Sequence, residues 1–386
     1  MEKTIKDLDI YISDGNYSSK YPRSEEFVKE GIPFIRGNNM VDGDISDDEM
    51  YYITPEKHAI LLKGHVKAGD VLITTRGNIG QVAIVPERHE DSNINAQIVL
   101  LRTNSKSLYN RYLLWALQSH RANEQYIALQ TGTALKQLPV GKLEKLSIKV
   151  ADIDEQHDIA NTLDKVYEII KERRKELLLL DNLIKARFVE MFGDMKPTVT
   201  IERYIAELRG GKSLAGTEEC KNKVLKTGAA TFGWFDPEQY KYLPVDYEPL
   251  PEHKVETGDV IISRMNTPEL VGACSYVFEA PEDMYYPDRL WKVIPQPETN
   301  PIFLWQLLWD REIRRQIKEK SGGTSGTMHN ISKSKLLEIK CIDAPIELQN
   351  QFAGFVHQVD KSKVAVKKAL EQAQLLFDSL MQEYFG

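Results

Sequence analysis

The sequence has few cysteines and no long apolar run, which limits the classes of protein to which it can belong. Its three cysteines, Cys220, Cys274 and Cys341, are scattered without a CxxC pair. A disulfide framework or a thiolate zinc site is therefore not indicated, and buried thiols are the simpler interpretation. No apolar run approaches the roughly twenty residues of a membrane span, and the N-terminal residues contain no apolar signal segment. We expect a soluble, cytoplasmic protein.

An excess of basic residues is also missing. The formal net charge is −7, although basic and acidic residues balance over residues 1–151. Proteins that bind nucleic acid usually have a basic face that neutralises phosphates. A mildly acidic chain can still have such a face, but we expect weak DNA binding by the isolated chain and help from a partner.

Catalytic motifs are absent as well. The segment Gly211-Lys212-Ser213 resembles the end of a phosphate-binding loop, but Ala206 stands where that loop requires its first glycine. There is no HExxH motif and no Asn/Asp-Pro-Pro-aromatic methyltransferase motif. The eight histidines are scattered along the sequence. The sequence therefore predicts no catalytic residues, no metal site and no cofactor.

Proline is missing throughout Asp152–Gly193, where apolar residues recur every three or four positions. This spacing predicts one long helix with a seam of coiled-coil type, about 60 Å long at about 1.5 Å per residue. Asp152 and Glu155 have the spacing of a capping box at its start, and Gly193 marks its end. Arg173 and Arg187 occupy two positions of the stripe. The predicted seam is Ile159, Leu163, Val166, Ile170, Leu177, Leu180 and Ile184.

The same helical pattern returns 193 residues later, over residues 345–386. Gln156 matches Gln349, and Phe192-Gly193 matches Phe385-Gly386 at the end of the chain. Only Lys363 interrupts the second apolar stripe. The chain is therefore an internal duplication. The second predicted seam is Phe352, Val356, Val359, Val366, Leu370, Phe377 and Leu380.

The two remaining segments, residues 1–151 and 194–344, have a mixed helix and strand pattern. In the first, strands are predicted at Ile32–Arg36, Val71–Thr74 and Gln81–Val85, a helix from about Asn110 to Leu129, and a strand at Leu146–Val150.

The second segment repeats this order of elements. Val66–Ile73 returns as Val255–Ile262, and each run is followed by an arginine, Arg76 or Arg264. A helix is predicted near Phe303–Trp309 and a strand at Leu337–Ile342. A loop with glycine and threonine follows the helix in each segment, at 131–133 and at 322–327. We therefore predict an α+β fold with two similar globular domains separated by two long helices.

The connectivity predicts that the two helices are antiparallel. The first globular domain leads into the start of the first helix, and the second is attached to its end. If the second domain is compact, the second helix begins near the point where the first helix ends. The halves are then related by an approximate two-fold axis, which matches two half-sites on one DNA duplex, with the coil setting their spacing.

In this ordered duplication the sequence resembles the specificity subunits of type I restriction-modification systems. The resemblance rests on the Gly-Asp-Val strands followed by Arg76 or Arg264, the Gly-Thr loops, the Glu-Gln-His-Asp-Ile-Ala start at Glu155, and the ending Ala186–Gly193. It covers the whole chain. The resemblance implies target-recognition domains at 1–151 and 194–344 and conserved helices at 152–193 and 345–386. It also implies a non-catalytic chain that binds two methyltransferase subunits, with restriction subunits joining the complex. The second helix departs from the pattern, because Leu348-Gln349-Asn350 replaces the usual Glu-Gln start.

Several polar residues are candidates for contact with DNA. Arg76 and Arg264 follow strands and have side chains suited to guanine, although a role as surface arginines or in phosphate binding is also open. Asparagine and glutamine side chains suit adenine edges, but asparagine also forms turns. The glycine-rich loops offer hydroxyl and amide groups to phosphate. The full set is Arg36, Asn38, Asn39, Thr75, Arg76, Asn78, Asn95, Gln97, Thr131, Thr133, Lys136, Lys212, Arg264, Asn266, Arg289, Thr327, His329 and Asn330.

These features favour a subunit that recognises a bipartite, asymmetric sequence in double-stranded DNA, because the loops of the two domains differ. One alternative is an adaptor whose coil joins two ligand-binding or protein-binding domains. A nuclease that acts alone is a further alternative, but the chain lacks an evident cluster of carboxylates for it.

Overall fold

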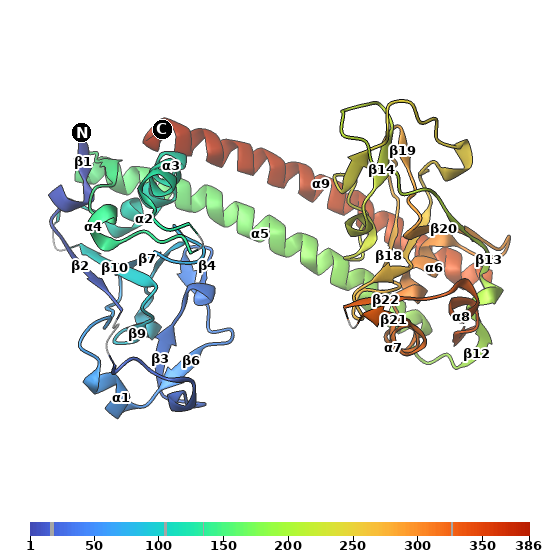
Figure 1. Cartoon of the computed structure of the whole chain (residues 1–386), viewed down its shortest axis with the longest axis horizontal. Helices are drawn as coiled ribbons and strands as arrows, with labels where there is room; N and C mark the ends of the chain where they lie inside the picture. The colour runs from blue at the N-terminus through green and yellow to red at the C-terminus, as the bar shows by residue number, and fades with distance from the viewer. Residues whose placement is uncertain (16–18, 104–105, 134, 326) are drawn as a thin grey trace. The chain divides into compact units, whose positions relative to one another are not determined.

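A computed structural model describes the chain except for residues 16–18, 104–105, 134 and 326 (Figure 1). The chain divides into two compact units. Unit 1 comprises Met1–Arg174 and Lys368–Gly386, and unit 2 comprises Lys175–Lys367. Each unit contains one globular segment together with parts of two 40-residue helices, α5 (Ile153–Phe192) and α9 (Ile346–Phe385). The predicted mixed helix and strand fold with two long helices is therefore confirmed.

Unit 1 is built around a four-stranded antiparallel sheet with the strand order β2-β10-β7-β8. A second sheet has the order β6-β3-β9, and β1 pairs with β11. The strands are β1 (Glu2–Thr4), β2 (Ile10–Asp14), β3 (Ile32–Ile35), β4 (Met40–Val41), β5 (Asp44–Ile45), β6 (Tyr51–Ile53), β7 (Val71–Thr74), β8 (Val82–Ile84), β9 (Asn93–Ile94), β10 (Ile98–Thr103) and β11 (Ser147–Lys149). The helices are α1 (Pro55–Ile60), α2 (Asn110–Gln118), α3 (His120–Leu129) and α4 (Val140–Leu143), with 3-10 turns η1 (Ile5–Asp7), η2 (Ser24–Glu26), η3 (Gly37–Asn39) and η4 (Glu87–His89).

Unit 2 repeats this topology. Its main sheet has the order β13-β20-β16-β18, its second sheet β15-β14-β19, and β12 pairs with β23. A third sheet, β17-β22-β21, is added. The strands are β12 (Pro197–Thr200), β13 (Ile205–Gly210), β14 (Lys223–Leu225), β15 (Tyr240–Tyr242), β16 (Val260–Ser263), β17 (Met265–Asn266), β18 (Cys274–Tyr276), β19 (Met284–Tyr285), β20 (Leu290–Pro295), β21 (Gly322–Ser325), β22 (Met328–Asn330) and β23 (Lys340–Ile342). The helices are α6 (Pro301–Leu308), α7 (Arg311–Lys320) and α8 (Lys333–Leu337), with 3-10 turns η5 (Ile201–Arg203), η6 (Thr227–Ala230) and η7 (Pro251–His253).

The continuous apolar runs of β7 and β16 follow from their position inside the main sheets. Successive side chains of a strand point to opposite faces. Val71 and Ile73 pack in the hydrophobic cluster that contains α2, while Leu72 packs in the cluster on the other face. In unit 2, Val260 and Ile262 face α6, and Ile261 faces the opposite cluster. Both strands are covered on both faces, so they have no polar alternation.

The repeated Gly-Asp pair before these strands forms the same turn twice. Gly69 and Gly258 have φ values of 85° and 96°, in the left-handed region that glycine adopts easily. Asp70 Oδ2 accepts a hydrogen bond from the backbone N–H of Lys67 at 2.8 Å. Asp259 Oδ2 likewise accepts one from the N–H of Glu256 at 2.8 Å. These hydrogen bonds stabilise the turns that precede β7 and β16, which explains why the sequence repeats the aspartates.

Each of these buried aspartates also has a basic partner. Arg102 donates two hydrogen bonds of 2.7 Å to the carboxylate of Asp70, and this pairing raises the pKa of Arg102. Lys292 Nζ lies 3.1 Å from Asp259, while burial raises the pKa of Asp259. Both carboxylates are nearly inaccessible, so each needs its cation.

Three predictions about secondary structure were wrong. The segment Asn110–Leu129 is not one helix but two, α2 and α3, because Ser119 is extended and its Oγ caps α3 by accepting from the N–H of Ala122 at 3.2 Å. The predicted loop 322–327 contains strand β21, which pairs with β22; Gly326 lies outside the described residues. Leu337 ends α8 rather than beginning a strand, and β23 starts at Lys340.

The long helices pack antiparallel within each unit. In unit 1, Arg174 donates to Gln374 at 3.4 Å, and the ring centroids of Tyr167 and Phe377 are 5.6 Å apart. In unit 2, later residues of α5 meet earlier residues of α9: the rings of Phe188 and Phe352 are 5.4 Å apart. The predicted seam residues Ile159, Leu163, Val166, Ile170, Ile184, Phe352, Val356, Val359 and Val366 are buried, and Leu177, Leu180, Leu370, Phe377 and Leu380 are half-buried.

The seam is more than a contact between two helices. Ile159 and Leu163 belong to the same hydrophobic cluster as Trp115 of α2. Lys363, which interrupts the apolar stripe, forms an ion pair of 2.6 Å with Asp181. The long helices therefore contribute to the hydrophobic cores of the globular segments. The charged residue in the apolar stripe, Lys363, is stabilised by its ion pair with Asp181.

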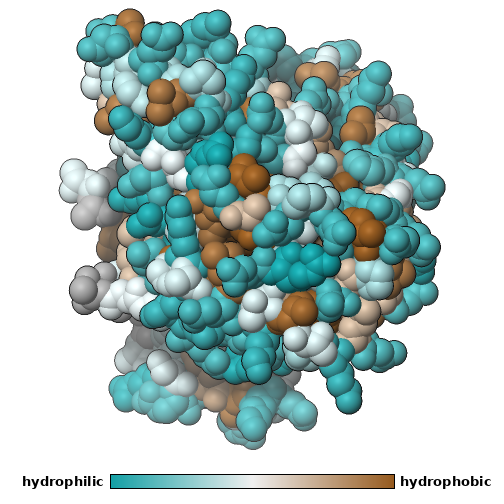
Figure 2. Space-filling view, turned by 90° about the vertical axis from the view of Figure 1, so that its right-hand side faces the viewer, coloured by the Kyte–Doolittle hydropathy of each residue, from teal (hydrophilic) through white to brown (hydrophobic). Residues whose placement is uncertain are grey.

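Hydrophobic residues appear only in small separate patches on the face that Figure 2 shows, which is mostly hydrophilic. Neither α5, α9 nor any other helix among the described residues has an apolar stretch sufficient to cross a membrane.

Candidate nucleic-acid interface

Four segments of unit 1 that are distant in the sequence come together beside the ends of β3, β7 and β10. The backbone N–H of Thr75 donates to the carbonyl of Gln97 at 2.7 Å, and Leu138 donates to Thr75 at 2.8 Å. Asn95 donates to Ile35 at 2.9 Å. We call this surface loop cluster 1 and define it by residues 36–39, 75–81, 95–97 and 131–138, of which residue 134 lies outside the described residues.

Loop cluster 1 includes all eleven DNA-contact candidates from the first half of the sequence. Arg76 and Thr131 both form a bridge with Gln137, so the arginine that follows β7 lies against the glycine-rich loop. The exposed candidates are Asn38, Arg76, Asn78, Gln97, Thr131, Thr133 and Lys136.

Three candidates are buried beneath this surface. The amide of Asn39 donates to the carbonyl of Asp48 at 2.9 Å. Thr75 Oγ1 donates to the carbonyl of Gln97 at 3.0 Å, and Asn95 Oδ1 accepts from the N–H of Gln97 at 3.0 Å. These side chains hold the loops in place, so for Asn39 and Asn95 the turn-forming alternative describes what they do in this structure.

Arg36 lies at the edge of the cluster and is half-buried. Its guanidinium lies over the ring of Tyr51, 3.5 Å from the centroid, and donates to the carbonyl of Glu49 at 2.7 Å. Its Nε is buried without a hydrogen-bond partner among the described residues. Tyr51 was not among the residues predicted from the sequence, because its spacing from Arg36 has no recognisable motif.

The equivalent segments of unit 2 also come together. The N–H of Arg264 donates to the carbonyl of Arg289 at 3.1 Å, and Ile331 donates to Arg264 at 3.0 Å. Gly211 donates to Pro287 at 3.0 Å. We call this surface loop cluster 2 and define it by residues 211–213, 231–234, 264–267, 287–289 and 327–331. Lys212, Arg289 and Thr327 are exposed on it.

Strand pairing positions the other candidates of unit 2. Asn266 of β17 is opposite His329 of β22, and Met265 is opposite Asn330. The Nδ1 of His329 lies 2.9 Å from the hydroxyl of Ser321.

Two polar atoms of loop cluster 2 lack partners. Arg264 Nε and Asn330 Oδ1 are buried and have no hydrogen-bond partner among the described residues. A bound molecule that supplied an acceptor and a donor would satisfy these groups.

Two exposed aromatic residues, which were not predicted from the sequence, belong to loop cluster 2. Phe232 and Trp234 are 61% and 57% exposed, and their rings stack with centroids 5.7 Å apart and an interplanar angle of 28°. The preceding residue, Thr231, accepts a hydrogen bond from Asn266 at 3.4 Å. The available signal was an aromatic-rich run, Phe232 to Phe235, outside any apolar periodicity. Flat rings exposed beside polar groups are suited to stacking on bases.

Polar contacts attach the long helices to both globular segments. Gln156 of α5 is fully buried: its Oε1 accepts from the N–H of Tyr109 at 2.9 Å, and its Nε2 donates to the carbonyls of Ser107 and Ala151 at 2.8 and 2.9 Å. Gln349 of α9 accepts from the N–H of Asn300 at 2.9 Å and donates to Ala344 at 2.8 Å. The matched glutamines thus attach the long helices to the starts of α2 and α6.

The chain is similar to known proteins over most of its length. A family model for the type I restriction modification DNA specificity domain matches residues 2–179. The type I restriction enzyme EcoKI specificity subunit of Escherichia coli is 19% identical over 92% of this chain and 82% of its own length. The MjaVIII specificity subunit of Methanocaldococcus jannaschii is 22% identical, over 94% of this chain and 84% of its own. The crystal structure of a type I restriction-modification S subunit from M. genitalium shares the fold, with a TM-score of 0.59, 18% identity, and coverage of 100% of this chain and 96% of that chain.

Proposed function

Because this chain belongs to the family of type I restriction-modification specificity subunits, we propose that it recognises a bipartite, asymmetric DNA sequence. Loop cluster 1 contacts one half of the site and loop cluster 2 contacts the other. In this proposal residues 1–151 and 194–344 are the two target-recognition domains, and residues 152–193 and 345–386 are the conserved helices.

One observation supports this proposal most strongly. Two sheets of identical topology, β2-β10-β7-β8 and β13-β20-β16-β18, place an arginine at equivalent strand ends, Arg76 and Arg264. The side chains of the two loop clusters differ: amides and threonines are frequent in loop cluster 1, whereas loop cluster 2 contains Asn330, Lys212 and the aromatic pair. The same scaffold with different side chains is expected of two domains that recognise different bases.

The chain acts in this proposal without catalysing a reaction. It assembles with other subunits of a type I system, and two methyltransferase subunits bind along α5 and α9 and methylate adenine after flipping it from the duplex. Restriction subunits join the same complex. The acidic net charge of −7 is consistent with a chain that binds DNA well only within such an assembly.

Methylation mapping tests the recognition of two different half-sites. The chain is expressed with its methyltransferase subunits, and the methylated sequence is determined in the host genome and in a strain without the chain. We expect one bipartite motif with unlike halves. Methylation of an unchanged motif by a complex that lacks residues 194–344 would refute the role of loop cluster 2.

We further propose that the paired helices set the distance between the half-sites. One heptad inserted after Arg174 in α5 and one after Lys367 in α9 extends each helix by about 10 Å. This corresponds to about three base pairs at about 3.4 Å each. The methylated motif is expected to keep both halves and gain that number of base pairs in its spacer, while an unchanged spacer would contradict the proposal.

An adaptor that joins two protein-binding or ligand-binding domains is the alternative. It predicts no salt-dependent binding of duplex DNA, with or without partner subunits. Retention of DNA measured at about 50 and about 200 mM salt separates the two proposals, since a protein that contacts phosphates loses affinity steeply over this range.

A further inference from the structure

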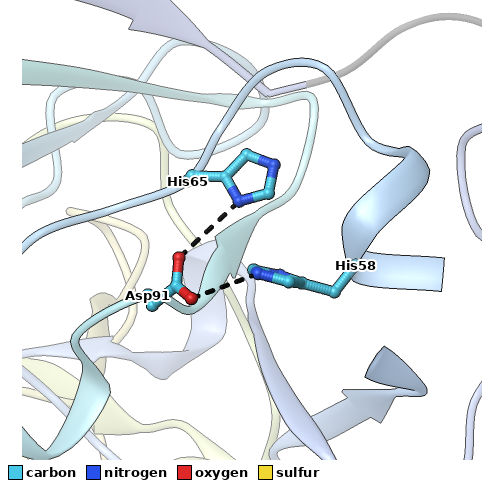
Figure 3. Close-up of side chains that lie close together, drawn as sticks. All are labelled: His58, His65 and Asp91. Carbon is cyan, nitrogen blue, oxygen red and sulfur yellow. Dashed lines mark ion pairs between the residues drawn. The ribbon is translucent and has the colours of Figure 1, made fainter. Parts of the chain in front are cut away.

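Unit 1 brings together three residues that the sequence leaves apart: His58 of α1, His65 in the connection to β7, and Asp91 just before β9. Figure 3 shows the three side chains pointing toward one another. His58 Nε2 lies 3.3 Å from Asp91 Oδ2, and His65 Nδ1 lies 3.8 Å from Asp91 Oδ1. One nitrogen from each ring and one carboxylate oxygen all lie within 4.8 Å of one another.

The hydrogen bond on the far side of each imidazole ring indicates which of its two nitrogens has the proton. His65 Nε2 lies 2.7 Å from the carbonyl oxygen of Leu61, which only accepts, so this nitrogen has the proton. His58 Nδ1 lies 2.5 Å from Oδ1 of the buried Asn93, another acceptor. When the imidazoles are neutral, the nitrogens that face Asp91 therefore present lone pairs.

Two lone pairs and a carboxylate repel one another unless a cation lies between them. Among the described residues, the ion pairs of Asp91 are those with the two histidines, and no lysine or arginine is paired with it. Asp91 is also held at a φ of 60°, in the left-handed region that side chains rarely adopt. With neutral imidazoles the arrangement therefore lacks a positive charge.

In unit 2 a lysine is paired with the equivalent aspartate. Asp283 corresponds to Asp91 and has the same left-handed backbone, with a φ of 53°. Lys254 takes the place of His65, since each forms the bridge to the neighbouring strand, at Tyr285 and Asn93 respectively. Lys221 Nζ lies 3.5 Å from the Asp283 carboxylate. Among the described residues, Asp283 is thus paired with an ammonium group, whereas Asp91 is paired with imidazoles.

We propose that His58, His65 and Asp91 bind a divalent transition-metal ion, with Zn²⁺ as the expected ion. Two imidazole nitrogens and one carboxylate oxygen form a zinc ligand set, whereas Mg²⁺ and Ca²⁺ prefer oxygen alone. Tetrahedral bonds of about 2.0–2.1 Å place ligand atoms about 3.3 Å apart, close to the separation of His58 from Asp91. Asp91 is exposed, so water fills the fourth position.

The acceptors behind the rings have the arrangement expected of a metal site. Ligating histidines usually donate their other N–H to a carbonyl or carboxylate group, which fixes the orientation of the ring. Here the carbonyl oxygen of Leu61 and the side-chain oxygen of Asn93 are these acceptors. The metal would join α1 to the start of β9, the strand that leads into Asn95 and Gln97 of loop cluster 1. Its role is structural and independent of the DNA sequence recognised.

Titration of the purified full-length chain with ZnCl₂ after chelation tests this proposal. We expect one zinc per chain by calorimetry and by elemental analysis. We expect Co²⁺ to give the visible absorption of a four-coordinate site. His58→Gln and Asp91→Asn should each weaken zinc binding more than tenfold, whereas His120→Gln, at an exposed histidine outside the cluster, should not.

A variant with the residue of unit 2 at one ligand position keeps the test decisive if other variants unfold. His65→Lys introduces the residue that unit 2 has at the equivalent position, Lys254, so the chain should fold without metal and bind no zinc. Zinc should raise the melting temperature of the original chain and leave that of His65→Lys unchanged. An ion pair between protonated imidazoles and Asp91 would instead give a melting temperature that falls with rising pH and does not respond to zinc. That result, or equal zinc binding by all variants, would overturn the proposal.

Discussion

The two units share their framework and differ at their loop surfaces. Gln156 and Gln349 make equivalent hydrogen bonds at the starts of the long helices, and Asp70 and Asp259 close equivalent turns. These repeated polar side chains satisfy backbone groups inside the fold. A buried N–H or carbonyl has the same requirement in both units, while exposed loop residues have no such common requirement.

The cores also differ in one instructive way. At matched seam positions, unit 1 has Ile159 and unit 2 has Phe352, which contacts Phe188 and Phe192. We expect Phe352→Ala to lower the free energy of unfolding by about 3–5 kcal/mol and Ile159→Val by about 0.5–1.5 kcal/mol. Urea denaturation of the two variants measures this difference. Similar losses would show that the aromatic cluster of unit 2 adds little to its packing.

The matched glutamines offer a sharper comparison. Gln156→Ala and Gln349→Ala each leave a part-buried N–H without its acceptor, at Tyr109 and Asn300. We expect each to lower the free energy of unfolding by about 1–3 kcal/mol, because a donor shielded from water bears a desolvation cost when it loses its acceptor. The exposed Gln351→Ala serves as the control, with an effect within about 0.5 kcal/mol. If the two variants lose very different amounts of unfolding free energy, the two attachments are not equivalent.

The arginines at equivalent strand ends should act on different halves of the DNA site. Arg76→Ala and Arg264→Ala are each expected to weaken specific DNA binding by the complex by about 1–3 kcal/mol and to relax the sequence preference in one half only. Methylation of a library of sites by the complex measures the preference. Lys212→Ala is the matched comparison, with a nearly uniform loss over all sequences if it contacts phosphate. Identical relaxation in both halves would contradict separate recognition.

The aromatic pair distinguishes loop cluster 2 from loop cluster 1. Trp234→Ala should weaken DNA binding by about 1 kcal/mol, since the loss of one stacking ring costs about 1–3 kcal/mol and Phe232 remains. Quenching of Trp234 fluorescence by duplex DNA gives an independent measurement. Exposed Val245, which lies outside both loop clusters, provides the control variant Val245→Ala. Unaltered affinity and fluorescence would exclude stacking on DNA.

The smallest expected effect concerns the interruption of the apolar seam. Lys363→Leu restores the apolar stripe but removes the partner of Asp181, which is partly exposed and can be hydrated. We expect a change within about 1 kcal/mol in the free energy of unfolding. Lys363→Leu combined with Asp181→Ala should be at least as stable as the original chain. A large loss in this double variant would mean that the ion pair determines how the helices pair.

The sequence was sufficient to predict the long helices, the duplication and the central strands. These features depend on periodicity and on buried apolar runs, which the sequence displays directly. It did not reveal the break at Ser119, where a side-chain cap ends one helix and starts another, or strand β21, whose pairing with β22 joins residues that lack an apolar alternation.

The candidate interface could also be predicted from the sequence only in part. Residue type and turn position were enough to propose Arg76, Gln97 and Arg264, all of which lie on the loop clusters. They could not separate the exposed Asn78 from the buried Asn39, because burial depends on segments far away in the chain. They also gave no indication of Phe232 and Trp234 as surface residues, since aromatic side chains are usually predicted to be buried.

The sequence by itself determined that the chain contains two related halves with long helices, because local periodicity and repetition are properties of the chain alone. The tertiary structure alone decided which polar residues meet. His58 and Asp91 come together only because α1 and the start of β9 pack in the same unit, and Thr75 meets Gln97 only through the sheet. Contacts between distant residues depend on the whole fold, and the chemistry of this protein depends on those contacts.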